Sequence, residues 1–482
     1  MVMALDSTPA EEIAGLPVEA TVAEKKEAAP PKAEGMKVET PKFKNREEAV
    51  EDFKTRFLRF ISESYGYKNG ESFEGKRALE PKEYHGLIHT FDVMSGMEEC
   101  LDVLKKDCPT LFDKDSKLEK FGPLSSCVAA AHDVMMQDVV FDRGIDAERV
   151  KLRGVWVKDI TGNARLQALL AQSRLKPVGN PGDDMPVLLN DIDVKTRTLL
   201  EDEELGEIMG NEMYSAVVAW HELQTYIDED GKKLFDDVSI EEIIESVAVT
   251  LPSMVLRVEE DGRKHFEVSQ PYLTDGSSVF DLLLAQNDLR GAAGRGSYET
   301  YITSSNSELR ERLKGVSDTL GEGSILNDLP ESTQEADKVL EDRVKIATTL
   351  LNWRKNADLF VRSQHRQFDE LLDGNKFLNP KDLLQREALG LISHEESIQL
   401  TQAKRAKEKI KGLFGNFDSN ETLSRERYLA LEDVFGLSKD SFEGSEEAYE
   451  QARQVRLGTA VKDTEKFKTL LKEFGYSVET SE

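Results

Sequence analysis

Cysteines and long apolar runs are scarce in this sequence. Its 482 residues include three cysteines, Cys100, Cys108 and Cys127, an odd number without the spacing of a metal site or a Cys-x-x-Cys pair. We therefore expect reduced, structural thiols in a cytoplasmic protein. No apolar run reaches the roughly 18 residues that a membrane span needs. The N-terminus also lacks the basic region and apolar core of a signal peptide.

Acidic residues outnumber basic residues in this sequence. Lys and Arg total 63 against 92 Asp and Glu, which gives a net charge of −29. Such a surface repels nucleic-acid backbones and anionic lipids, so we expect neither a nucleic-acid polymer nor a membrane as the main partner. The sequence also lacks a phosphate-binding glycine loop, because the Gly-x-Gly at 294–296 follows no predicted strand.

Composition and apolar periodicity divide the chain into segments. Residues 1–45 are rich in Ala, Glu, Lys and Pro and are predicted to be a disordered tail. A helical domain is expected over 46–300, with an insertion at 143–205 that is either a lid or an inert surface excursion. Helices over 301–375 are expected to complete the bundle, and 376–482 to form a helical extension.

Two of the seven histidines lie four residues apart, in the segment 84–92. In a helix, His85 and His89 would lie one turn apart on one face. Apolar residues at helical spacing form a separate stripe: Leu87, Phe91, Met94, Met97, Leu101 and Leu104. The helix can therefore pack one face into a core and turn an imidazole pair toward a cleft. Taken alone, such a pair is more often two surface or hydrogen-bonded histidines.

A second signal follows, where His132 and Asp133 end the small apolar run 128–131. Polar side chains at the end of a buried helix need partners, and a divalent cation is an efficient one. Imidazole nitrogen and carboxylate oxygen together suit zinc, manganese or iron. The doublet therefore makes a metal site the better explanation of the upstream histidines.

These residues resemble the HD-domain superfamily of metal-dependent phosphohydrolases, whose pattern is a His, then a His-Asp doublet, then a distant Asp. The Tyr-His-x-x-x-His-Thr-x-Asp form at 84–92 is most similar to the branch related to cyclic-nucleotide phosphodiesterases and to bacterial predicted HD hydrolases. The resemblance covers about 46–295, outside the insertion. It implies an all-α helical bundle, with additional C-terminal helices in this chain. Strands are expected only within 247–256 and 264–268.

The resemblance also implies a set of metal ligands: His89, His132, Asp133 and Asp288. Asp288 matches the last Asp of the family pattern best, and Asp281, on the same helical face, is its competitor. The set would hold one or two divalent ions, of Mn, Zn, Mg or Fe, and leave positions for water.

Three further residues receive roles. His85, beside a ligand, is the candidate general acid that protonates the leaving oxygen. Glu212 would orient a ligand or a coordinated water, or else serve as a carboxylate at a helix N-terminus. Arg290 would neutralise a substrate phosphate. His221 lies roughly opposite Glu212 on a regular helix and is assigned a structural role. The family's later Thr-x-x-His segment has no histidine here, at 249–253.

The function expected from these residues is hydrolysis of a small phosphorylated substrate by a metal-activated water. Nucleotides and nucleotide-derived messengers are the default substrates of the superfamily. Two alternatives stay open. One is a non-catalytic HD-fold regulatory or nucleotide-sensing protein, and the other is an HD-type di-iron oxygenase. His85 favours the hydrolase over the sensor, because a pure binding site needs no general acid.

Overall fold

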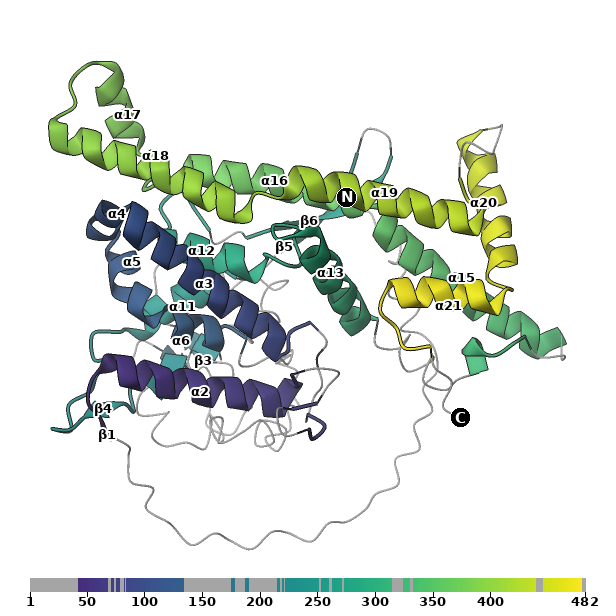
Figure 1. The fold of residues 1–482 in the computed structure, drawn as a ribbon, viewed down its shortest axis with the longest axis horizontal. Coiled ribbons are helices and arrows are strands. Elements are labelled where there is room, and N and C mark those ends of the chain that lie inside the picture. The colour runs from purple at the N-terminus through teal and green to yellow at the C-terminus, as the bar shows by residue number, and fades with distance from the viewer. Residues whose placement is uncertain are drawn as a thin grey trace, which may run out of the picture. The chain divides into compact units, whose positions relative to one another are not determined.

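The computed structural model describes most of the chain between residues 42 and 478. The described residues are 42–67, 71–72, 75–78, 82, 84–133, 175–177, 187–189, 215–216, 219–220, 222–250, 253–259, 262–270, 273–313, 324–329, 333–438 and 445–478. They are predominantly helical, which confirms the predicted all-α class (Figure 1). Most of the predicted tail lies outside them, although residues 42–45 already form a short strand and a helix cap.

The chain forms two compact units. We call Pro41–Ser305 with Leu359–Asn420 the site unit, and Asn306–Asp358 with Glu421–Glu482 the second unit. The helices of the site unit are α2 (Arg46–Tyr65), α3 (Leu87–Asp107), α4 (Pro109–Lys114), α5 (Ser116–Phe121), the 3₁₀ turn η1 (Gly122–Leu124), α6 (Ser125–Ala131), α11 (Ile240–Ala248), α12 (Val279–Asp288), the start of α13 (Tyr298–Arg312), α16 (Ala357–Gly374), α17 (Lys381–Ala388), α18 (His394–Phe414) and the start of α19 (Phe417–Phe435).

The second unit has its own elements and its own core. Its elements are the rest of α13, the 3₁₀ turn η2 (Ser324–Leu326), α15 (Thr333–Lys355), the rest of α19, α20 (Glu446–Ala460) and α21 (Thr464–Glu473). Leu350, Leu457 and Leu470 are fully buried in this core. Val361, Phe368, Ala406 and Ile410 instead pack in the site unit.

This division differs from the predicted boundaries at 301–375 and 376–482. Helices α16 and α18 belong to the site unit, whereas α15, α20 and α21 form the second unit. Apolar periodicity shows that a helix has a buried face. It does not show which of two cores that face enters.

Helix α3 is the central element of the site unit. The predicted apolar stripe is buried except for Phe91, which is partly buried, and Leu87, Met97 and Leu104 are fully enclosed. It packs against α2, α6, α12 and α18 (Figure 1). The helix ends at Asp107 because Pro109 disfavours the helical conformation of Cys108, which lies at φ −141° and ψ 51°.

Helix α6 is short and every one of its residues is buried. Its run of small side chains, 129–131, allows close packing against α2 and α3. A helix that is apolar on all sides is stable only inside a core. The turn that follows α6, which carries His132 and Asp133, is therefore held at the end of α3.

A single buried carboxylate anchors α12. Asp115 accepts a hydrogen bond from the Leu118 amide at 3.1 Å, which caps the start of α5. It also accepts from Ser278 Oγ at 2.8 Å and from the Val279 amide at 2.6 Å, at the start of α12. Negative charge is favourable at both helix N-termini. Asp115 thereby fixes the position of α12, whose last residue is Asp288.

The described strands form three two-stranded pairs. β1 (Lys42–Phe43) pairs in parallel with β4 (Ile227–Asp228), and the antiparallel pairs are β2 (Leu175–Pro177) with β3 (Val187–Leu189) and β5 (Ser253–Val258) with β6 (Lys264–Ser269). The strands expected within 247–256 and 264–268 form the β5–β6 hairpin. Residues 247–248 instead end α11, because the capping box of Ser239 and Glu242 starts a helix that runs through them.

Two simpler expectations can be compared with the structure directly. All three cysteines are buried and form no disulfide. None of the described helices combines the length and apolar composition that crossing a bilayer requires. Of the insertion at 143–205, only β2 and β3 lie within the described residues.

Candidate metal centre

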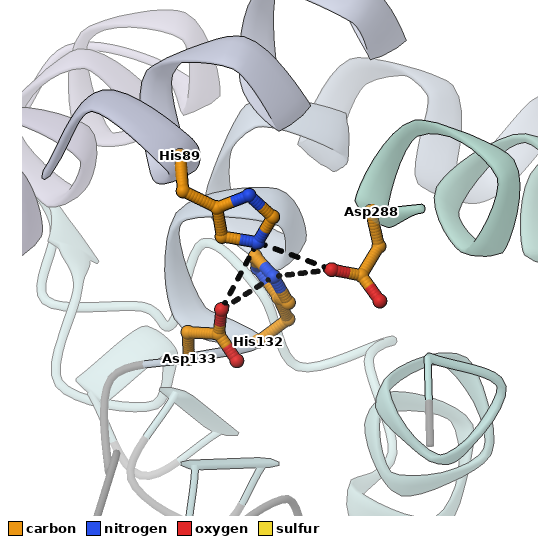
Figure 2. A group of neighbouring side chains, drawn as sticks. All are labelled: His89, His132, Asp133 and Asp288. Atoms are coloured by element: carbon orange, nitrogen blue, oxygen red, sulfur yellow. Dashed lines mark hydrogen bonds and ion pairs between the residues drawn. The ribbon is translucent and has the colours of Figure 1, made fainter. Parts of the chain in front are cut away.

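The four predicted ligands meet at one point of the site unit. His89 lies in the first turn of α3, His132 and Asp133 in the turn after α6, and Asp288 at the end of α12 (Figure 2). One donor atom from each residue lies within 4.8 Å of the other three. The cluster is buried, apart from slight exposure of Asp288. Two helices and the turn after a third therefore supply one compact His/Asp cluster that can hold a metal ion.

Distances within the cluster match the spacing of ligands around one ion. His89 Nε2 lies 3.3 Å from Asp133 Oδ2 and 3.1 Å from Asp288 Oδ1. His132 Nε2 lies 2.9 Å and 3.5 Å from the same two oxygens. Two ligands at about 2.1 Å from an ion are about 3.0 Å apart at a right angle and about 3.4 Å apart at the tetrahedral angle. The observed distances cover this range, and nitrogen and oxygen alternate around the cluster.

A backbone carbonyl sets the tautomer of His132. Nδ1 of this ring lies 2.6 Å from the carbonyl oxygen of Ala129. Because a carbonyl can only accept a hydrogen bond, Nδ1 carries the proton. In the neutral ring, Nε2 then presents a lone pair to the cluster, which is the arrangement that a metal ligand needs.

Two atoms of the cluster are buried without a hydrogen-bond partner. They are His132 Nε2 and Asp133 Oδ2, which lie 2.9 Å apart yet do not have hydrogen-bond geometry. The side chains of His132 and Asp133 gather at the same place as those of His89 and Asp288 (Figure 2). Buried polar atoms left unpaired are costly. An ion at the shared point would satisfy both, so these residues fit a divalent metal.

Metal binding at the cluster is coupled to the release of protons from His89 and His132. Burial lowers the pKa of His89, but the neighbouring carboxylates of Asp133 and Asp288 raise it to about 9. Burial likewise lowers the pKa of His132, and the charge of Asp133 outweighs this and raises it well above the usual range. A metal ion needs neutral imidazoles, so it must displace the protons that these pKa values favour.

His85 lies beside the cluster but not on α3. The helix begins at Leu87, with Gly86 as an extended N-cap at φ −89° and ψ −168°, so the expected one-turn relation to His89 is not formed. The His85 ring centroid is nevertheless 5.9 Å from that of His89. The ring of Tyr84 lies 4.7 Å from both histidines. His85 is half-buried and is not one of the four residues of the cluster.

The remaining candidates from the sequence are Asp281, Arg290, Glu212 and His221. Asp281 pairs with Lys117 at 2.8 Å and lies outside the cluster, so the competitor of Asp288 is a structural residue. Arg290 lies 3.4 Å from Glu99, where it has a protein carboxylate as partner. Glu212 and His221 lie outside the described residues.

Sequence reasoning missed Arg295, which follows Asp288 by seven residues. This arginine is almost completely buried, although arginine is among the residues least often found inside proteins. One signal was available in the sequence, because Arg295 is enclosed by Gly294 and Gly296 directly after the last ligand. Its side-chain partner, Gln364, however, comes from α16, and Asn420 of α19 donates to the carbonyls of Gly294 and Gly296, both far along the chain.

Comparison with models of known protein families, with curated proteins and with solved structures finds no match for this chain. The resemblance to the HD-domain superfamily therefore stays a prediction that rests on the residues themselves. The geometric finding is independent of it: a buried cluster of two histidines and two aspartates that can hold a metal ion.

Proposed function

We propose that this protein is a metal-dependent phosphohydrolase that hydrolyses a small phosphate ester. The observation that carries the proposal is the aim of His132 Nε2 and Asp133 Oδ2, which are buried, unpaired and directed at the point that His89 and Asp288 also face. Two nitrogen and two oxygen donors leave open positions on a six-coordinate ion, as hydrolysis requires.

A divalent ion held by these residues would lower the pKa of a water molecule and polarise a phosphoryl oxygen. The protein's own groups would do the remaining work. Asp133 and Asp288 supply two negative charges that balance the ion. The Ala129 carbonyl holds His132 in the tautomer that keeps Nε2 free of hydrogen. The three helices hold the donors in place before the substrate arrives.

His85 is the candidate proton donor of the reaction. In its protonated form it would give its proton to the leaving oxygen as the bond between phosphorus and that oxygen breaks. The oxygen of the attacking water forms the new bond to phosphorus, and the proton of that water passes to solvent. The position of the ring, 5.9 Å from that of His89, puts His85 next to the ligands without making it one.

The test uses the full chain, stripped of metal and then reloaded with Mn²⁺, Zn²⁺ or Fe²⁺. Hydrolysis of p-nitrophenyl phosphate and of bis-p-nitrophenyl phosphate should appear with metal and vanish with chelator. Asp288→Asn should abolish it, whereas Asp281→Asn, which alters an aspartate paired with Lys117, should retain it if the chain folds. Absence of hydrolysis in protein shown to bind metal would contradict the proposal and favour a sensor. Iron-dependent oxygen uptake without hydrolysis would favour an oxygenase.

A further inference from the structure

His85 lies in a turn whose backbone is tied to the end of α2. The Lys82 amide donates a hydrogen bond to the Tyr65 carbonyl oxygen at 2.9 Å. The Leu87 amide donates to the Gly66 carbonyl oxygen at 3.0 Å. These two bonds fix the backbone before and after His85. They do not fix its imidazole, because the side chain can still rotate about its own bonds.

Tyr84 contacts this imidazole and two of the candidate ligand residues. The centroid of its ring lies 4.7 Å from that of His85, with the ring planes 82° apart, which is a favourable edge-to-face arrangement. It also lies 4.7 Å from the ring centroid of His89, with the planes 34° apart. The Tyr84 hydroxyl donates to the Asp288 carbonyl oxygen at 3.5 Å, a long hydrogen bond. Tyr84 therefore packs between the candidate proton donor and the metal cluster.

The position of His85 needs such a contact. His89 is buried, whereas His85 and Tyr84 are half-buried, so these two rings lie between the core and solvent. A bound ion would hold the ring of His89, but not that of His85, which is not one of the four cluster residues. A proton donor must stay within hydrogen-bond reach of the oxygen that it protonates, and a small displacement slows the reaction severely.

We propose that Tyr84 is a positioning residue, which holds the imidazole of His85 beside the metal ligands and within reach of the leaving oxygen. This inference rests on the proposed function. Tyr84 exchanges no proton in the reaction and acts through His85. Its aromatic ring is the part that matters, because the ring packs against both imidazoles while the hydroxyl makes only the long bond to Asp288.

The kinetic test compares Tyr84→Leu, which removes the ring, with Tyr84→Phe, which keeps it, in the metal-loaded full chain. Tyr84→Leu should lower kcat for aryl phosphates with poor leaving groups by about 10- to 100-fold, the effect of misplacing a reacting group. The loss for good leaving groups should be smaller, and KM should change little. Tyr84→Phe should recover most of the rate. Tyr67→Leu makes the same change at an exposed tyrosine and serves as the control.

A double-variant cycle shows whether Tyr84 acts through His85. In a chain that already carries His85→Ala, Tyr84→Leu should cause no further loss of kcat, because the group that it positions is gone. Additive losses in the double variant would overturn the proposal. So would equal losses for good and poor leaving groups, or a Tyr84→Phe variant as slow as Tyr84→Leu.

A second measurement needs no turnover. Relaxation of ¹³C-labelled histidine rings reports their mobility from picoseconds to nanoseconds, in the full chain with Zn²⁺ and without metal. The His85 ring should be as rigid as that of His89 in wild type and in Tyr84→Phe. In Tyr84→Leu it should approach the mobility of His394, which is exposed. A His85 ring that is as mobile as His394 in wild type, or that stays rigid in Tyr84→Leu, would overturn the proposal.

The two proposals can fail separately. A His85 ring that loosens in Tyr84→Leu, in a protein that hydrolyses no ester, would contradict the phosphohydrolase and leave the hold of Tyr84 on His85 standing. Hydrolysis by wild type, with additive losses in the double variant, would contradict the role of Tyr84 and leave the phosphohydrolase standing.

Discussion

The tautomer of His132 links one backbone carbonyl to the chemistry of the whole cluster. The Ala129 carbonyl, which accepts the hydrogen bond from Nδ1, lies in the last turn of α6, where carbonyls generally lack a helical partner. The end of a short helix thus orients a ligand histidine. Sequence reasoning found His132 from its place after the run 128–131, but the carbonyl that orients it becomes visible only with the backbone.

Substitution of His85 distinguishes a general acid from a metal ligand. His85→Ala should leave the metal in place and slow hydrolysis of esters with poor leaving groups by about 10²–10⁴-fold, the usual contribution of a positioned acid. Esters with good leaving groups need little protonation, so their loss should be much smaller. The measurement is kcat for a series of aryl phosphates, with His394→Ala, an exposed histidine, as the control. Equal losses across the series, or loss of metal, would remove His85 from the role of acid.

The raised histidine pKa values predict how metal affinity depends on pH. Since the pKa of His89 is about 9 without metal, an ion must displace a proton at pH 7. Affinity should therefore rise about tenfold per pH unit between pH 6 and 8 for each proton released. Calorimetry in buffers of different ionisation enthalpy counts these protons. Affinity that is constant over this range would show that the imidazoles are already neutral.

The metal-free protein should show the opposite trend in stability. The folded-state pKa of His89, about 9, lies above its unfolded value near 6.5. The stability contributed by the imidazolium is therefore fully present below about pH 6.5 and is lost as pH rises through 9. Urea unfolding of the chelator-treated protein at several pH values measures this. His89→Gln should flatten the pH dependence in that window.

At the scale of elements, the centre depends on how closely α3 and α12 approach. A Cβ atom on Gly96 of α3 would lie 2.0 Å from Asn287 Oδ1, next to Asp288 on α12. Asn287 is fixed by its bond to the Leu283 carbonyl at 2.9 Å, so it cannot easily move aside. Glycine is thus the residue that lets the two helices bring His89 and Asp288 together.

Gly96→Ala should destabilise the protein by about 1–3 kcal/mol, the usual result of overpacking a core. It should also weaken metal binding, because α12 must shift away from α3. Gly412→Ala is the matched control: this glycine lies in α18 with open space around it, so alanine should stabilise the helix by up to about 1 kcal/mol. Urea unfolding and metal titration of both variants make the comparison. An effect of Gly96→Ala no larger than the control would show that the helices have room to adjust.

The elements themselves were largely predictable, because local signals determine them. The apolar stripe of α3 and the proline at 109 indicate where this helix packs and where it stops. The start of the helix was not predictable to the residue. Gly86 takes an extended conformation as N-cap, which moves His85 into a turn. The burial of Arg295 could not be predicted either, because it depends on Asn420 and Gln364, which the fold brings from distant segments.

At the scale of the whole molecule, the two units have separate cores. No residue is shared between the core clusters of the site unit and the second unit. All four candidate ligands belong to the site unit. This division could not be predicted, since α15 and α16 follow one another in sequence and each has a buried apolar face, yet they belong to different cores.

The separation into two cores predicts which helices a bound metal protects from hydrogen exchange. Added Mn²⁺ binds only the folded site unit, so it should stabilise that unit by mass action. Hydrogen exchange followed by mass spectrometry should show slower exchange in peptides from α3, α6 and α12. Peptides from α20 and α21 should exchange at unchanged rates. Equal protection in both units would show that they unfold as one cooperative structure.

The most direct test of the central claim is the metal content of His132→Ala. This variant removes one donor and leaves His89, Asp133 and Asp288 in place. After loading and dialysis, elemental analysis should find metal in wild type and in the His394→Ala control. It should find only a small fraction of that amount in His132→Ala. A metal content in His132→Ala equal to that of wild type would contradict the claim that these four residues form a metal centre.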